Sequence, residues 1–316
     1  MNSQTNNAEA AANVVVFSIN PNSGASDNGK LCASIAARLE SKGFQAILST
    51  DLDEVEAETK KHLQSGSLRA VVAAGGDGTI ALLANRLPRE TPFAILPLGT
   101  ENLLGLHLGL KAEEDFFVSL VEHGSQTRID AGRANGKLFL VVASCGFDAA
   151  VVKRLDEVRS GHISRASWLK PIWQTILSYR FPILKYSLDD EPPIEARWAF
   201  IFNIPRYAIG LRITPEAIDS DGKLDICTFQ GRGVFRGLWY LLVTYMGGHS
   251  RLDASRLAQF RKLKIESDSD RPVYYELDGD PGGELPLEIE VVPQALRILL
   301  PQSDGLKKTR ARNASE

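Results

Sequence analysis

Four apolar stretches in the first 100 residues are separated by segments with helical patterns. The helical patterns cover residues 30–42, 51–64 and 79–87. Continuous apolar strands that alternate with helices are typical of a parallel sheet covered by helices. The sequence therefore predicts a three-layer α/β domain at the start of the chain. The apolar stretches are "NVVVFSI" (13–19), "FQAILST" (44–50), "LRAVVAA" (68–74) and "FAILPLGT" (93–100).

The pattern changes after about residue 128. An Asn135-Gly136 pair predicts a tight β-hairpin. The strand-like runs that follow predict a mostly antiparallel second domain, interrupted by helical stretches at 149–180 and 234–248. Residues 1–12 and 303–316 have the composition of disordered tails, and the second of these is basic. The runs are 197–204, 224–230, 263–267, 273–277 and 287–292.

Three unusual loops follow the predicted parallel strands: "INPNSG" (19–24), "GGDGT" (75–79) and "LPLGTEN" (96–102). In such sheets, ligands bind at the carboxyl ends of the strands. Glycines let backbone N–H groups approach an anion, and a helix N-terminus adds positive charge. Asp77 would repel a phosphate, so it suggests either a metal ion or a hydrogen bond to a ligand hydroxyl.

The glycine loop at 75–79 differs from two common phosphate-binding motifs. It lacks the Gly-Lys-Ser/Thr of a Walker A loop, and Ala81 and Leu82 break the Gly-x-Gly-x-x-Gly pattern. A tight turn with no ligand is the alternative reading. Three such loops after neighbouring strands favour a binding site.

Charge and cysteine content narrow the class of protein. The chain carries 36 basic and 39 acidic residues, a formal net charge of -3, which argues against a nucleic-acid partner. The three cysteines, Cys32, Cys145 and Cys227, lie far apart and are expected to be buried thiols in a reducing cytoplasm. The N-terminus has no signal-peptide pattern, and no apolar run is long enough to span a membrane.

The three loops, at this spacing, resemble the diacylglycerol kinase catalytic domain family, in particular the bacterial lipid kinases of the YegS type. The family also has sphingosine kinases and, more distantly, NAD kinases as relatives. The motifs that carry the resemblance are N-P-x-S-G, G-G-D-G-T and P-L-G-T-x-N, followed by "GFDAAVV" (146–152), "ITPEAIDSDGKLDI" (213–226) and "LDGDPGG" (277–283).

This resemblance implies a Rossmann-like α/β domain at 13–128, an antiparallel β-sandwich with helical insertions at 129–295, and a cleft between them. It also implies that residues 296–302 return to the first domain. The implied cofactors are ATP and Mg²⁺. The residues expected to bind ATP are Asn20, Ser23, Gly24, Thr50, Gly75, Gly76, Asp77, Gly78, Thr79, Gly99, Thr100 and Asn102.

Two carboxylates in the segment "LDGDPGG" are the candidate catalytic acids, with Asp77 as a third. If that segment is extended, Asp278 and Asp280 point to one side. Two neighbouring carboxylates push one pKa up and suit proton transfer or metal binding. Relatives usually carry Glu at the second position, so the reach of Asp280 is shorter by one methylene. The roles of Asp278 and Asp280 as the base stay open between them.

The segment "DSDGKLD" (219–225) resembles a calcium loop but fails the EF-hand pattern, which would need ligands at Ala217 and Thr228. In the family that this chain resembles, the segment holds a structural Mg²⁺. The implied ligands are the carboxylate of Asp221 and the backbone carbonyls of Ile218 and Lys223. A solvated turn is the alternative, and Ca²⁺ in place of Mg²⁺ stays open.

The resemblance implies an ATP-dependent lipid kinase that is cytoplasmic and visits the inner membrane surface. Its acceptor is a hydroxyl of a diacylglycerol-like lipid, phosphatidylglycerol or a sphingoid, and a homodimer is compatible with it. The basic and aromatic segment 149–180 suits contact with anionic lipid, although helix packing is the simpler reading. One alternative is an NAD kinase, although Asn85-Arg86 stands where those relatives carry Asn-Glu. Another is a non-catalytic sensor. Leu103 replaces an Asp that many relatives carry.

Overall fold

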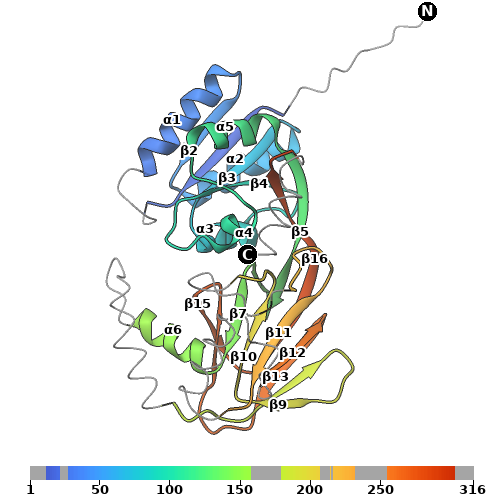
Figure 1. The fold of residues 1–316 in the computed structure, drawn as a ribbon. Coiled ribbons are helices and arrows are strands. Elements are labelled where there is room, and N and C mark those ends of the chain that lie inside the picture. The colour runs from blue at the N-terminus through green and yellow to red at the C-terminus, as the bar shows by residue number, and fades with distance from the viewer. Residues whose placement is uncertain are drawn as a thin grey trace, which may run out of the picture. The chain divides into compact units, whose positions relative to one another are not determined.

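The computed structural model describes residues 12–21, 28–157, 179–206, 214, 216–231 and 255–302. These residues form two compact units. The first unit comprises the chain up to Thr127 together with a segment that begins at Leu296, and the second comprises Arg128–Ala295. The ribbon in Figure 1 shows the elements of each unit.

The first unit is built on a parallel sheet in the order β2-β1-β3-β4. All six residues of β4 are apolar or proline, and five of the six residues of β1 are buried. Strands buried on both faces need helices on both faces, as the sequence predicts. The strands are β1 (Val14–Ile19), β2 (Gln45–Ser49), β3 (Leu68–Gly75) and β4 (Pro92–Pro97).

Helices connect these strands and cover the sheet. Right-handed crossovers place α1 on one face and α2 and α3 on the other, because β2 and β4 lie on opposite sides of the β1–β3 pair. α1 packs on α5, where Arg38 forms an ion pair with Glu114 at 3.2 Å. The helices are α1 (Asn28–Ser41), α2 (Leu52–Gln64), α3 (Asp77–Arg86), α4 (Leu103–His107) and α5 (Glu114–His123).

The second unit contains a six-stranded antiparallel sheet in the order β12-β11-β10-β7-β14-β15. α6 (Phe147–Glu157) contacts β7, β14 and β15 of this sheet. The strands are β7 (Val142–Cys145), β10 (Trp198–Phe202), β11 (Leu224–Phe229), β12 (Ser255–Phe260), β14 (Tyr274–Leu277) and β15 (Asp280–Glu284).

A second set of strands completes a β-sandwich in this unit. It contains the first part of β16, which pairs with β13, and then β8 and β9. One apolar core lies between the two sheets and includes Tyr186, Ile201 and Tyr275. The additional strands are β5 (Ser125–Ala134), β6 (Lys137–Phe139), β8 (Leu184–Leu188), β9 (Ile194–Ala196), β13 (Lys262–Ser267) and β16 (Leu287–Leu300).

The long strand β16 contributes residues to both units. Its first part pairs with β13 in the second unit. Its last part lies parallel to β4 in the first unit, where Arg297 and Ile298 are in register with Pro92 and Phe93. The final residues of this strand therefore extend the sheet of the first unit by one strand.

The fold class is confirmed: an α/β unit with a parallel sheet and an antiparallel β-sandwich unit. The Asn135-Gly136 hairpin is also confirmed, with φ of 45° and 89° at the two residues between β5 and β6. β8, β9 and β12 carry no prediction from the sequence. The predicted helix at 234–248, residues 158–178 of the predicted helical stretch after α6, and the tails at 1–11 and 303–316 lie outside the described residues.

The three cysteines are buried thiols, as predicted. Burial raises the pKa of Cys32 to about 11 and that of Cys227 to about 12. Among the described residues, no helix is long and apolar enough to cross a membrane.

Candidate functional site

Three loops of the first unit follow strands that are neighbours in the sheet. β1 pairs with β3 and β3 pairs with β4, all parallel, so the residues after Ile19, Gly75 and Pro97 lie at one edge. Direct contacts also join the loops. The N–H of Asn20 donates to Ala74 O at 3.1 Å, and the N–H of Leu98 donates to Gly75 O at 2.9 Å.

Asn20 and Thr79 connect the first loop to the second. The Asn20 side-chain amide donates to Thr79 Oγ1 at 3.2 Å. Thr79 is buried in the first turn of α3. The hydroxyl of Thr79 thus joins the loop after β1 to the first turn of α3.

Glycines allow the second and third loops to approach each other closely. A Cβ on Gly99 would lie 2.5 Å from the Cα of Gly76, and a Cβ on Gly75 would lie 2.2 Å from Thr79 Oγ1. No real Cβ tolerates such distances from its neighbours. The loops can pack in this way only because these positions are glycines. Since Gly76 and Gly78 have no side chains, nothing from these two residues covers the start of α3.

Asp77 joins the second loop to the third. Its Oδ2 accepts the N–H of Leu103 at 2.8 Å, and its Oδ1 accepts the N–H of Leu104 at 3.0 Å. Burial raises the pKa of Asp77, and these two N–H groups offset that rise only in part. The carboxylate caps the N-terminus of α4, a contact that the sequence does not reveal.

Asn102 shapes the third loop from within. Its backbone is left-handed, with φ of 50°, and its Oδ1 accepts the N–H of Gly99 at 2.8 Å. Its Nδ2 donates to Gly99 O at 2.7 Å. Thr50 and Thr100 are exposed in their loops, and Gly78 is exposed in the first turn of α3. Ser23 and Gly24 lie outside the described residues.

The second unit carries the predicted acid pair in a tight turn. Asp278 and Gly279 are the two residues between β14 and β15, and both have positive φ, 52° and 88°. Such values are typical of a type I′ hairpin turn. The segment is therefore not extended, and the argument that alternation places Asp278 and Asp280 on one side does not apply.

The carboxylate of Asp278 is held by three backbone N–H groups. Its Oδ2 accepts from Leu140 at 2.7 Å, and its Oδ1 accepts from Val141 at 2.8 Å and Val142 at 3.0 Å. Several N–H donors on one carboxylate favour its ionised form. Asp280 is exposed at the first position of β15.

A buried acid lies two residues before this turn, and the sequence predictions do not include it. Glu276 is 2% exposed in β14, and its Oε2 accepts the N–H of Gly279 at 2.8 Å. Asp148 of α6 lies near it and accepts a hydrogen bond from the Ser144 hydroxyl at 2.8 Å. A charged residue in the apolar run "VYYEL" is the signal that could have revealed it.

The predicted metal loop is a turn before β11. Asp221 is exposed and accepts the N–H of Lys223 at 3.0 Å, and Ile218 is also exposed. Buried Asp130 holds this loop by accepting the N–H of Gly222 at 2.7 Å. Among the described residues, no three His, Cys, Asp or Glu side chains are grouped so that they could hold a metal ion.

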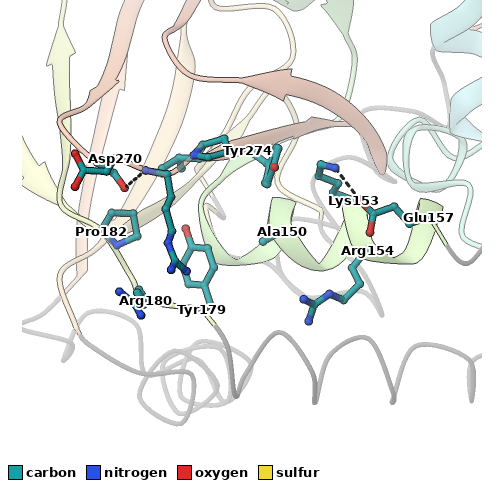
Figure 2. A pocket seen from close by; sticks show the side chains of 13 residues that line it. Ala150, Lys153, Arg154, Glu157, Tyr179, Arg180, Pro182, Asp270 and Tyr274 are labelled. Atoms are coloured by element: carbon teal, nitrogen blue, oxygen red, sulfur yellow. Dashed lines mark hydrogen bonds and ion pairs between the residues drawn. The ribbon is translucent and has the colours of Figure 1, made fainter.

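A cavity of about 400 Å³ lies beside α6 in the second unit. Figure 2 shows Lys153, Arg154 and Glu157 on α6, with Arg180 and Tyr179 on the segment before β8. Lys153 pairs with Glu157 at 2.8 Å and lies over the ring of Tyr274, 4.7 Å from its centroid. Four basic and two acidic side chains line the cavity: Lys153, Arg154, Arg180, Arg271, Glu157 and Asp270.

The fold and these sites define a two-unit protein, with glycine loops at the strand ends of an α/β unit and a β-sandwich that carries an Asp-Gly-Asp turn. Comparison with known families gives two matches. Residues 13–134 match the diacylglycerol kinase catalytic domain, and residues 141–300 match the YegS C-terminal NAD kinase β-sandwich-like domain. The chain belongs to this family of diacylglycerol and lipid kinases.

Two curated relatives are similar along nearly their whole length. A diacylglycerol kinase of Mycobacterium tuberculosis is 29% identical over 297 residues, which cover 90% of this chain and 94% of the relative. A protein of Pseudomonas aeruginosa named probable lipid kinase YegS-like is 28% identical over 283 residues, which cover 88% of this chain and 92% of the relative.

Solved structures share the fold. A diacylglycerol kinase from Bacillus anthracis has a TM-score of 0.63 at 17% identity, covering 92% of this chain and 98% of that chain. An NAD kinase from Archaeoglobus fulgidus, solved in complex with ATP, has a TM-score of 0.51 at 14% identity, covering 96% and 98%.

Proposed function

We propose that this kinase transfers the γ-phosphate of ATP to a hydroxyl group of a membrane lipid. The observation that carries the proposal is the joining of three glycine-containing loops at the N-terminus of α3. Asn20, Thr79 and Asp77 provide the side-chain contacts between the loops. The family membership supports kinase chemistry, and ATP in the structure of the NAD kinase relative supports the choice of donor.

The phosphates of ATP would bind at the second loop. The N-terminus of α3 carries partial positive charge, and Gly76 and Gly78 place no side chain over its first turn. In this proposal, Asp77 does not touch the nucleotide, because its two oxygens hold the N–H groups of Leu103 and Leu104. The remaining predicted ATP contacts, including Thr50 and Thr100, stay proposals.

The acceptor hydroxyl needs a base, and the Asp278–Asp280 turn provides two candidates. An ionised carboxylate at hydrogen-bond distance can take the proton as the oxygen attacks phosphorus. Three backbone N–H donors hold the carboxylate of Asp278 in place, whereas Asp280 is exposed at the start of β15. We assign the turn as the catalytic element and leave the base as either acid.

Mg²⁺ is proposed in two places. With ATP, the ion would neutralise phosphate charge during transfer. In the loop before β11, Asp221 and the carbonyls of Ile218 and Lys223 would hold a structural ion. The loop has the hard oxygen donors that Mg²⁺ prefers: Asp221 is exposed and the nearby Asp225 is buried.

Contact with an anionic membrane is proposed for the cavity beside α6. Its four basic side chains outnumber its two acidic ones, and Tyr179 and Tyr274 add aromatic surface. Basic and aromatic side chains together suit the headgroup region of an anionic bilayer. In this proposal, the protein works in the cytoplasm and visits the inner membrane surface transiently.

The decisive experiment is phosphate transfer from γ-labelled ATP with Mg²⁺. The acceptors are micelles of diacylglycerol, phosphatidylglycerol, sphingosine or ceramide, each tested separately, and a parallel tube contains NAD. Label in a single lipid identifies the acceptor. The matched variant is Asp280→Asn, which should bind ATP like the parent and transfer at least about a hundredfold more slowly.

The same experiment separates the alternatives. Label in NADP would assign the protein to its NAD kinase relatives. ATP binding without transfer to any acceptor would contradict the lipid kinase proposal and favour a sensor. Equal transfer by the parent and Asp280→Asn would exclude Asp280 from the mechanism, and Asp278→Asn then decides whether the turn takes part.

A further inference from the structure

Glu276 is a buried acid that none of the assignments above uses. It lies in the middle of β14, opposite Ser144 of β7. Its neighbours Tyr275 and Leu277 point into the sandwich core, so alternation directs Glu276 to the other face of the sheet, which α6 covers. Its Oε1 is fully buried and has no hydrogen-bond partner.

The surroundings of Glu276 disfavour a negative charge. Burial raises the pKa of Glu276 well above its ordinary value, and the charges of Asp148 on α6 and Asp278 in the turn raise it further. The N–H of Gly279 and the Ser144 hydroxyl lower the pKa of Glu276, but burial outweighs them and the pKa stays raised. Neither neighbouring charged residue favours an ionised Glu276. Lys153 on α6 forms an ion pair with Glu157, and Asp280 at the start of β15 carries the same sign of charge as an ionised Glu276.

Asp148 is better placed than Glu276 to carry a charge. It lies in the first turn of α6, where the helix dipole favours an anion, and it accepts the Ser144 hydroxyl at 2.8 Å. When two carboxyl groups are buried next to each other, their mutual repulsion disfavours ionisation of both, so one keeps its proton and the other is ionised.

We propose that Glu276 is a positioning residue for Asp278, acting as a neutral carboxylic acid that holds the turn through the N–H of Gly279. The proposal rests on the function proposed above for the turn. Asp278 and Gly279 both adopt left-handed backbone, which an L-residue such as Asp278 adopts only at a cost. Glu276 holds the turn by accepting the N–H of Gly279. The N–H groups of residues 140–142 hold the carboxylate of Asp278.

A neutral acid on this face also leaves Asp278 the charge it needs. An ionised Glu276 two residues away would repel a second ionised carboxylate. The uncharged form keeps the hydrogen-bond acceptor and removes that repulsion. Replacement by Gln, which is neutral and of the same shape, should therefore preserve the arrangement, whereas Leu should lose the acceptor for Gly279.

The test compares Glu276→Gln, Glu276→Leu and the exposed control Glu284→Gln in the full chain. With the lipid acceptor that the transfer experiment identifies, Glu276→Gln should keep kcat within about twofold. Glu276→Leu should lower kcat at least about tenfold, with the KM for ATP unchanged, because the N–H of Gly279 loses its acceptor and the turn that carries Asp278 loses its anchor. Equal losses in both variants, or no loss in Glu276→Leu, would overturn the positioning role.

Thermal unfolding between pH 5 and pH 8 tests the neutral form without any activity. A raised pKa in the folded state gives stability that is complete below the ordinary Glu pKa and is lost as pH rises. Glu276→Gln lacks this loss, so its Tm should gain on the parent from pH 5 to pH 8 by at least about 2 °C. If the difference in Tm between Glu276→Gln and the parent is the same at every pH, Glu276 gives no pH-dependent stability, and the neutral form is rejected.

Amide hydrogen exchange separates this inference from the proposed function. Glu276→Leu should speed exchange of the amides of Val141 and Val142, whose N–H groups hold Asp278, and Glu276→Gln should not. That pattern in a protein that phosphorylates no lipid would retain the role of Glu276 in the turn and reject the lipid kinase. Unchanged exchange in Glu276→Leu would reject the role of Glu276, whatever the activity.

Discussion

The carboxylate of Asp77 accepts the N–H of Leu103 at 2.8 Å, although the two residues are 26 positions apart in the chain. Through this contact and its neighbour at Leu104, the glycine loop after β3 fixes the start of α4 after β4. Asp77 therefore supports the proposed nucleotide site indirectly, because it holds the second and third loops in one arrangement.

Replacing Asp77 by Asn should weaken ATP binding. The carboxamide offers one acceptor oxygen in place of two, so one buried N–H group loses its partner at a cost of about 1–3 kcal/mol. Calorimetric titration with ATP and thermal unfolding measure the two effects. The control is Asp156→Asn, at an exposed position of α6. Unchanged affinity would mean that the third loop contributes little to ATP binding.

Replacing Gly99 by Ala should disrupt the joined loops more severely. The new Cβ would lie 2.5 Å from the Cα of Gly76, so the backbone must move. ATP binding should fall at least about tenfold, which corresponds to about 1.4 kcal/mol. Gly29→Ala is the matched control, because its Cβ would meet nothing within 4 Å and Ala favours the helix. Equal behaviour of the two variants would contradict the packing argument.

Substitutions at Asp280 should change catalysis without changing stability. The side chain is exposed, so Asp280→Ala should shift the free energy of unfolding by no more than about 0.5 kcal/mol while transfer falls. Asp280→Glu lengthens the acidic side chain by one methylene, keeps its charge and should keep activity. A loss of activity in Asp280→Glu as large as in Asp280→Ala would argue that the position requires Asp itself.

Mg²⁺ should stabilise the second unit through Asp221. A ligand that binds only the folded state raises Tm in proportion to the logarithm of its concentration. The parent should therefore gain in Tm when Mg²⁺ replaces EDTA, and Asp221→Asn should gain much less. Ca²⁺ in a third sample tests which ion the loop prefers. If the parent shows no gain with either ion, the loop is a solvated turn.

The cavity beside α6 should contribute to vesicle binding. Arg180→Gln and Arg271→Gln together remove two of its four basic side chains. Sedimentation with phosphatidylglycerol vesicles should fall, and binding by the parent should weaken as salt rises. Arg261→Gln, at an exposed turn between β12 and β13, is the control. Equal binding by parent and double variant, or equal binding to phosphatidylcholine, would place the membrane contact elsewhere.

The α/β unit was predictable because its strands are short, apolar and separated by clear helical patterns. β1 and β3 begin or end within one residue of the apolar runs that predict them. β8 and β9 were not predicted, because alternating charged residues such as Lys185 and Glu195 dilute their apolar pattern. Tertiary pairing with β13 and with each other determines those strands.

The sequence predicted which residues belong to the candidate site, but it did not predict the hydrogen bonds that join them. The loops stand out because Gly75, Gly76 and Gly99 follow apolar strands. The hydrogen bonds of Asp77 to α4 and of Asp278 to residues 140–142 join segments far apart in the chain, so no local pattern reveals them. Glu276 was missed because its partners come from β7, α6 and the turn, which only the fold brings together.

The pairing of Arg297 and Ile298 with Pro92 and Phe93 has a consequence for biosynthesis. A ribosome delivers β1 to β4 early, yet the strand that covers the open edge of β4 is made some 200 residues later. Until then, the edge of β4 has unpaired N–H and C=O groups that can pair with a strand of another chain. The nascent chain must therefore protect that edge for most of its translation, and a fragment ending near residue 134 would keep the hazard permanently.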